Sequence, residues 1–170
     1  LDVLDTLNVG LLVRGMVKHQ NCQEICIACI KLLANATYGS IERIQNVCDN
    51  EGIAAIENLM QVYRSDAETL AKILVLLANI AHGGDDLRKQ ISYRCADELV
   101  LILRDHNENY SLSLQAVRTI GILVYCEHNI GRFIDEHATI NIVGAARQHL
   151  LDTELVSLAL DVIANLSSEN

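Results

Sequence analysis

An apolar stripe with helical spacing recurs four times along the chain. Residues 32–35 (Leu-Leu-Ala-Asn) return as residues 76–79 after 44 positions, and as Val-Ile-Ala-Asn at residues 162–165 after a further 86. The copy expected between them, residues 119–122, has the same pattern but ends in Ile instead of Asn. Apolar residues at i, i+3 and i+7 form one face of an amphipathic helix. We therefore predict four long helices, over residues 24–38, 68–82, 112–126 and 154–167.

The aligned copies define columns of residues that share a role. Two columns are apolar and are expected in the core, and one column of small residues lets a neighbouring helix approach closely. The first apolar column is Leu33, Leu77, Ile120 and Ile163. The small column is Ala34, Ala78, Gly121 and Ala164. The second apolar column, three residues before the first, is Ile30, Leu74, Val117 and Leu160.

A second helix is predicted before each long one, because apolar pairs four residues apart recur in every copy. These pairs are Leu12 and Met16, Ile56 and Met60, Leu99 and Leu103, and Ile142 and Ala146. Ser, Asp and Asn commonly cap helix starts. The polar breaks before the long helices contain these residue types, at positions 21, 65–66, 106–109 and 152–153. Shorter apolar segments at 87–91 and 130–134 predict an additional first helix.

Three helices in 43 or 44 residues, with a long third helix, resemble the repeats of the armadillo family. The family pattern is a Gly-led second helix and a third helix ending in Leu-x-Asn-Leu, and it is visible at residues 51–56 and 163–166. The sequence departs from it at Ala54, where the family often has proline. The resemblance implies an all-α fold, a right-handed superhelical α-solenoid of three-helix repeats. HEAT-like repeats are the alternative, although they have two helices per unit and lack the Asn.

The resemblance covers the whole chain. It implies one repeat array over residues 1–170, with a partial repeat at 1–39 and full repeats at 40–83, 84–127 and 128–170. A solenoid needs polar capping repeats at its ends. This sequence has none, so we expect the array to be part of a longer protein.

The resemblance also implies a concave groove lined by the third helices. In family members that bind extended peptides, the Asn of the third helix hydrogen-bonds the ligand backbone, because an amide both donates and accepts. The Asn column here is Asn35, Asn79 and Asn165. The alternative role is to fix the backbone of a neighbouring repeat. Nuclear-import adaptors of this family have Trp four residues before the Asn, and this chain has no Trp.

Further candidate groove residues follow from the helical period. They are Lys31, Tyr38, Lys72, His82, Gln115, Arg118 and Tyr125. The basic side chains and the aromatic rim predict a partner segment, an extended peptide or a helix, that is acidic or amphipathic. The alternative is a solvated face without a ligand, since charged residues usually mark such faces.

Composition narrows the classes of function. The net charge is −9, from 13 basic and 22 acidic residues, which argues against a nucleic-acid partner. No uncharged run of 18 residues is present, so we predict no transmembrane segment. The sequence opens without the basic and apolar leader of a secretory signal, so we expect none. The reduced cysteines described next predict a cytoplasmic location.

The six cysteines predict buried thiols rather than a metal site. Cys22, Cys26 and Cys29 share one helix face, but zinc sites usually bring together two pairs from turns, and no second pair is present. We therefore expect Cys26 and Cys29 to be small buried hydrophobic residues in a reducing compartment.

No group of residues completes a catalytic site. None of the six histidines forms the zinc-type helix pair with Glu beside it. Cys48 or Cys126 could act as a nucleophile with His128 as base, but neither cysteine lies in a catalytic motif. We predict no enzyme activity, no cofactor and no metal.

The leading functional hypothesis is a protein-binding adaptor or scaffold. One alternative is a regulatory armadillo domain of a larger enzyme or motor-associated protein, which a neighbouring catalytic domain would reveal. Another is a scaffold tethered to a membrane by a lipid signal outside these residues.

Overall fold

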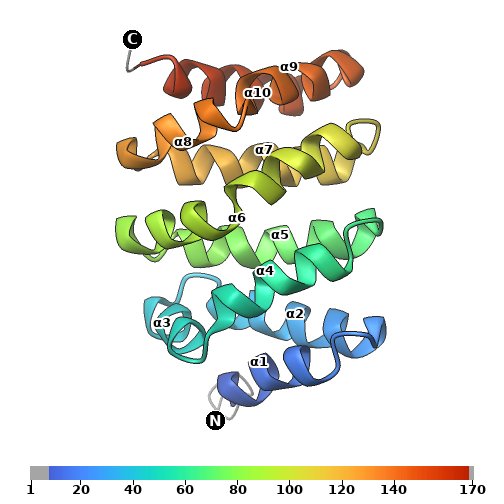
Figure 1. The fold of residues 1–170 in the computed structure, drawn as a ribbon, viewed down its shortest axis with the longest axis vertical. Helices are drawn as coiled ribbons and strands as arrows, with labels where there is room; N and C mark the ends of the chain where they lie inside the picture. The colour runs from blue at the N-terminus through green and yellow to red at the C-terminus, as the bar shows by residue number, and fades with distance from the viewer. Residues whose placement is uncertain (1–7, 169–170) are drawn as a thin grey trace.

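The computed structural model describes residues 8–168, and this part of the chain is a stack of helices joined by short turns (Figure 1). The α-helices are α1 (Val9–Lys18), α2 (Gln23–Thr37), α3 (Ile41–Asp49), α4 (Gly52–Val62), α5 (Ala67–Ala81), α6 (Asp85–Asp105), α7 (Tyr110–Val124), α8 (Ile130–Asp135), α9 (Ala138–Gln148) and α10 (Thr153–Leu166). A 3-10 turn, η2 (Glu127–Asn129), precedes α8. The predicted all-α fold is confirmed, and the four long helices lie within two residues of their predicted bounds.

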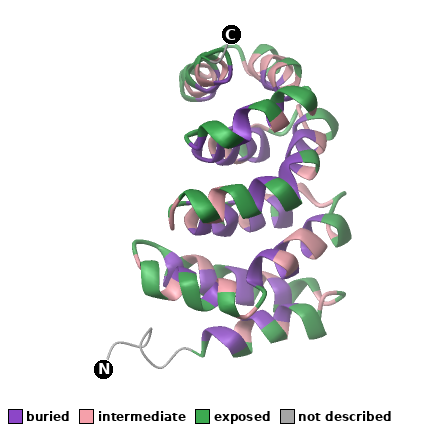
Figure 2. Cartoon of the chain, turned by 60° about the vertical axis from the view of Figure 1, so that its left-hand side comes forward, coloured by how far each residue is buried: buried purple, intermediate pink, exposed green. Residues whose placement is uncertain are grey.

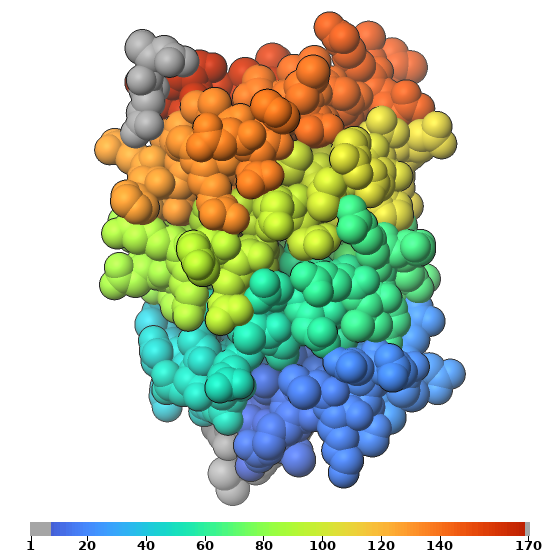
Figure 3. All heavy atoms as spheres, viewed as in Figure 1, coloured from blue at the N-terminus to red at the C-terminus, as the bar shows by residue number. Residues whose placement is uncertain are grey.

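The helices form two layers. The four long helices α2, α5, α7 and α10 contact one another in that order and form the third-helix layer. The remaining helices cover one side of it and form the outer layer (Figure 1). Figure 3 shows the outer layer as bands in chain order, so that each turn of the solenoid contacts its neighbours along the chain. The helices α1 and α10 lie at opposite ends of the stack (Figure 1).

Side-chain caps begin three of the long helices at the predicted breaks. Asp66, Asn109 and Asp152 each accept a hydrogen bond from the backbone N–H three residues later, at 2.9, 3.0 and 3.3 Å. Such a cap satisfies one of the free N–H groups at a helix start. The prediction differs at α2, where Cys22 instead of Asn21 occupies the cap position and makes no side-chain cap bond.

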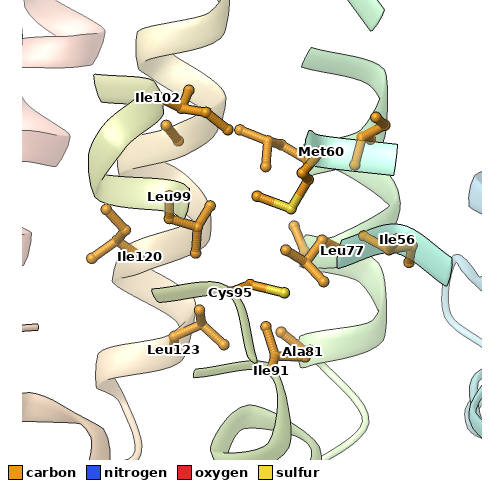
Figure 4. Packing of buried hydrophobic residues seen from close by; sticks show 14 of the residues in the cluster. Ile56, Met60, Leu77, Ala81, Ile91, Cys95, Leu99, Ile102, Ile120 and Leu123 are labelled. Carbon is orange, nitrogen blue, oxygen red and sulfur yellow. The ribbon is translucent and has the colours of Figure 1, made fainter. Parts of the chain in front are cut away.

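Most residues of the predicted apolar columns form the core between the layers, whereas Ile163 is only half-buried (Figures 2 and 4). Ile30, Leu33, Leu74, Leu77, Val117 and Ile120 are all buried. At Gly121, an added Cβ would lie 2.9 Å from a methyl group of Val162, so the small column does bring α7 and α10 close together.

Leu160 was expected in the core but is 62% exposed. Val117 is one turn before Gly121 on α7, and this side of α7 meets α10. Leu160 and Ala164 occupy the matching side of α10, where no described helix follows in the stack, and both are exposed. The column is therefore buried only where a further third helix packs on it.

A ladder of hydrogen bonds joins the repeats at one edge. Three polar rings, each at the C-terminal end of a second helix and 43 residues apart, donate to a backbone carbonyl in the preceding repeat. The bonds run from Tyr63 Oη to Gln20 O (2.8 Å), from His106 Nε2 to Arg64 O (2.7 Å) and from His149 Nε2 to Asn107 O (2.8 Å). We name these three rings the edge ladder. A carbonyl oxygen only accepts, so each His Nε2 carries its hydrogen.

The first and second helices of the middle repeat are fused into α6, a helix of 21 residues. In the flanking repeats, the last buried residue of the first helix lies five positions before the start of the second helix, from Val47 to Gly52 and from Phe133 to Ala138. The intervening Glu51 and His137 have left-handed backbones, with φ of 62° and 60°. In α6 the spacing from Ile91 to Cys95 is four, which keeps both side chains on one helix face and requires no break.

The cysteines are unpaired, and Cys26, Cys29, Cys95 and Cys126 are buried. Burial raises the pKa of the Cys95 thiol to about 12 and that of Cys48 to about 11. Because the thiolate is the reactive form, both should react slowly with thiol reagents in the folded protein. We expect titration of the unfolded protein without reductant to find all six thiols. A smaller number, or a tightly bound metal ion, would contradict the reduced-core prediction.

Candidate functional site

Seven of the predicted groove residues lie on the third-helix layer. Lys31 and Asn35 are exposed on α2, whereas those on the other three helices are half-buried. The half-buried residues are Lys72 and Asn79 on α5, Gln115 and Arg118 on α7, and Asn165 on α10. Lys72 and Asn79 are seven residues apart and therefore share one face of α5.

A hollow of about 360 Å³ lies between α5 and α7. Two predicted residues, Lys72 and Gln115, line it from opposite sides. The remaining lining residues are Ala67, Glu68, Ala71, Val75, Asn109 and Ser111. Small apolar side chains of α5 thus form part of a surface whose other part is polar. Such a mixture suits a ligand with both apolar and hydrogen-bonding groups.

Two of the three basic groups are paired with carboxylates of the same layer. Lys72 Nζ lies 2.6 Å from Glu68 Oε1, and Arg118 Nη2 lies 2.9 Å from Glu154 Oε1 on α10. Lys31 makes no ion pair with a described residue. The sequence interpretation missed both carboxylates. Glu68 could have been found from its i,i+4 spacing to Lys72, but Glu154 is 36 residues from Arg118 and meets it only through stacking of the helices.

The Asn column does not behave uniformly. Asn79 Nδ2 donates to the backbone oxygen of Ala34 on α2 at 2.9 Å, which joins two adjacent third helices. This bond corresponds to the alternative role, in which the amide fixes a neighbouring backbone. Asn35 is exposed, and neither its side chain nor that of Asn165 hydrogen-bonds a described residue.

The predicted aromatic rim lies at the C-terminal ends of the third helices. Tyr38, His82 and Tyr125 are the residues that directly follow α2, α5 and α7. The two tyrosines are 81% and 70% exposed, and His82 is exposed as well. All three rings are therefore free to contact a ligand at this edge of the layer.

No metal or membrane-spanning feature is found in residues 8–168. Within this range, no group of three or more His, Cys, Asp or Glu side chains could hold a metal ion. None of the helices there combines the length and the apolar character needed to cross a membrane.

Three solved structures resemble the chain over nearly all of its length. One engineered protein aligns with a TM-score of 0.82 and 22% identity over 96% of this chain, and a second with 0.80 and 23% over 98%. A designed armadillo repeat protein in complex with the peptide (KR)4 aligns with a TM-score of 0.77 and 21% identity over 94%. No protein-family model and no curated protein matches the sequence.

These likenesses show the fold. The chain is an α-solenoid of armadillo-type repeats, as its sequence predicts. It spans 64%, 39% and 64% of the lengths of the three matching chains.

Proposed function

We propose that the third-helix layer is the concave face of the solenoid and holds a segment of a partner protein, as expected of an adaptor or scaffold. The hollow between α5 and α7 carries this proposal, because it combines small apolar side chains with the polar groups of Lys72 and Gln115. The designed armadillo repeat protein of similar fold was solved with a peptide, which supports peptide binding by this kind of fold.

The ion pairs favour an amphipathic segment over a strongly acidic one. A carboxylate that approaches Lys72 or Arg118 competes with Glu68 or Glu154, which already neutralise them. An amphipathic segment avoids this competition, since its apolar side chains pack on Ala71 and Val75 in the hollow. Its backbone amides then bond with Gln115 and with the unpaired amide of Asn35.

The proposal is tested by removing two polar side chains that line the hollow, Lys72 and Gln115, together with Arg118, which follows Gln115 by three residues on α7. Peptides are selected from a random display library with the unaltered protein, and their Kd values are measured for Lys72→Ala, Gln115→Ala and Arg118→Ala combined. We expect binding to weaken at least about tenfold, because several hydrogen bonds are lost together. Unfolding free energy should change by about 1 kcal/mol or less, because the ion pairs of Lys72 and Arg118 are within reach of solvent and such pairs contribute little. Asn79 is left intact, since its bond to Ala34 stabilises the stack.

A matched control removes the same kinds of side chain from the outer layer. Gln90→Ala, Arg94→Ala and Arg104→Ala combined remove one amide and two cations, all at exposed positions of α6. This variant should bind the selected peptides with unchanged Kd. If it loses them while the third-helix variant retains them, the partner surface belongs to the outer layer and the proposal is wrong.

A further inference from the structure

A second pocket, of about 340 Å³, lies in the outer layer between the N-terminal half of α6 and the η2–α8 segment. Figure 3 shows these two segments as adjacent bands of the outer layer. The pocket is lined by Lys89, Ser92, Tyr93, His128, Asn129 and Arg132. Every one of these side chains can donate a hydrogen bond, and none carries a carboxylate. In a chain with a net charge of −9, such a lining is a local excess of positive charge.

Two donors of this pocket are buried without a partner. Ser92 is 1% exposed, and its Oγ has no hydrogen-bond partner among the described residues. The Nε of Arg132 is also buried and unpartnered in this part of the chain. Most buried polar groups are paired, because an unpaired one keeps its full cost of desolvation. Both atoms are therefore unused donors at the wall of the pocket.

The cations are available to such an acceptor. Arg132 makes no ion pair with a described residue, and its guanidinium carbon lies 5.7 Å from the centre of the Tyr93 ring. Stacking on a ring leaves the edge of the guanidinium free to donate. Lys89 has only a loose contact with Asp86, at 4.0 Å, and Asp86 is fully exposed. Asn129 is held in place by its bond to the Leu123 carbonyl at 2.9 Å.

Another pocket of the outer layer, between α3–α4 and α6, has a different character. It is lined by Glu51 and Arg94, among others, and so contains both signs of charge. Arg94 is also paired with Glu57 at 2.7 Å. An excess of unpaired donors is therefore a property of the α6–α8 pocket and not of every junction between repeats.

We propose that the α6–α8 pocket binds a phosphomonoester group. A phosphomonoester carries a charge of about −1.5 to −2 and three acceptor oxygens, which matches the cations Lys89 and Arg132 and the Ser92 hydroxyl better than a carboxylate does. The volume exceeds what a bare phosphate fills, and the exposed Tyr93 ring can contact the organic part of the ligand. This site is separate from the third-helix layer and does not depend on the function proposed for it.

The test titrates inorganic phosphate and O-phospho-L-serine into isotope-labelled protein and follows backbone amide NMR signals at constant ionic strength. We expect localised shifts at residues 89–93 and 128–132, with O-phospho-L-serine binding more tightly than inorganic phosphate. Equal affinity of the two would identify free phosphate as the ligand of the same pocket. Absence of localised shifts with both probes would overturn the proposal.

Two variants of pocket residues and one control variant show whether the ligand binds in this pocket. Arg132→Gln should weaken binding about tenfold, which corresponds to about 1.4 kcal/mol. Ser92→Ala removes only an unpartnered hydroxyl, so it should fold normally and still weaken binding by a measurable factor. Arg104→Gln removes an exposed cation at the far end of α6 that is paired with Asp105, and should leave the affinity unchanged. Equal weakening by Arg104→Gln and Arg132→Gln would show general charge attraction and refute a specific site.

Discussion

Replacing Leu77 with Asp is expected to unfold the protein. Leu77 is 0% exposed at the centre of α5, surrounded by apolar residues of α4, α6 and α7 (Figure 4). The change removes a fully packed side chain and buries an unpaired carboxylate. Together these should cost about 5 kcal/mol or more, which is comparable to the total stability of a small domain. Helical circular dichroism at 25 °C and a thermal melt would measure the loss.

Val75→Asp provides the matched control on the same helix. Val75 lies two residues away on the opposite face and is 38% exposed, so a carboxylate there stays hydrated. We expect its thermal midpoint to remain within a few degrees of the parent protein. If Leu77→Asp melted like the parent, the assignment of the apolar columns to the core would be wrong.

The second large effect is expected at the corner between α3 and α4. A Cβ on Gly52 would lie 2.7 Å from the backbone oxygen of Val47 and 2.3 Å from one of its methyl groups. A backbone oxygen cannot move aside by a change of rotamer, so Gly52→Ala must displace α3 from α4. We expect a loss of about 1–3 kcal/mol in unfolding free energy, measured by urea titration.

The same substitution at Gly144 should have the opposite sign. Gly144 lies inside α9, and an added Cβ there meets no atom within 4 Å. Ala is the better helix former because it has less backbone freedom to lose, so Gly144→Ala should stabilise by about 0.5–1 kcal/mol. Equal effects at the two glycines would contradict the close approach at Gly52.

The sequence predicted those features that depend on contacts along one helix. The burial of Leu33, Leu77 and Ile120 follows from helical periodicity alone, as do the positions of the third helices. The fusion within α6 could also have been predicted, because the spacing from Ile91 to Cys95 is one residue shorter than in the other repeats. The shorter spacing changes only the number of residues between the first and second helices. An alignment of apolar columns ignores that number.

Features that depend on packing between repeats were harder to predict. The exposure of Leu160 results from the absence of a following third helix in the described stack, and the residue itself resembles its buried counterparts. The pairing of Arg118 with Glu154 and the bond from Asn79 to Ala34 require the offset between neighbouring helices. Groove membership for the remaining residues stays a prediction, to be tested by the peptide measurements.

The edge ladder has a mechanical consequence for the solenoid. Tyr63, His106 and His149 connect each turn between second and third helices directly to the next, so the spacing between repeats is fixed along that edge. At the opposite edge, Gly39 and Gly84 have positive φ. A Cβ added to either glycine would meet no other atom within 4 Å, so little packs against these two turns. Elastic bending of the superhelix should therefore pivot about the bonded edge and widen or narrow the stack at the glycine edge. A partner longer or shorter than the resting repeat spacing would be accommodated by that one-sided motion.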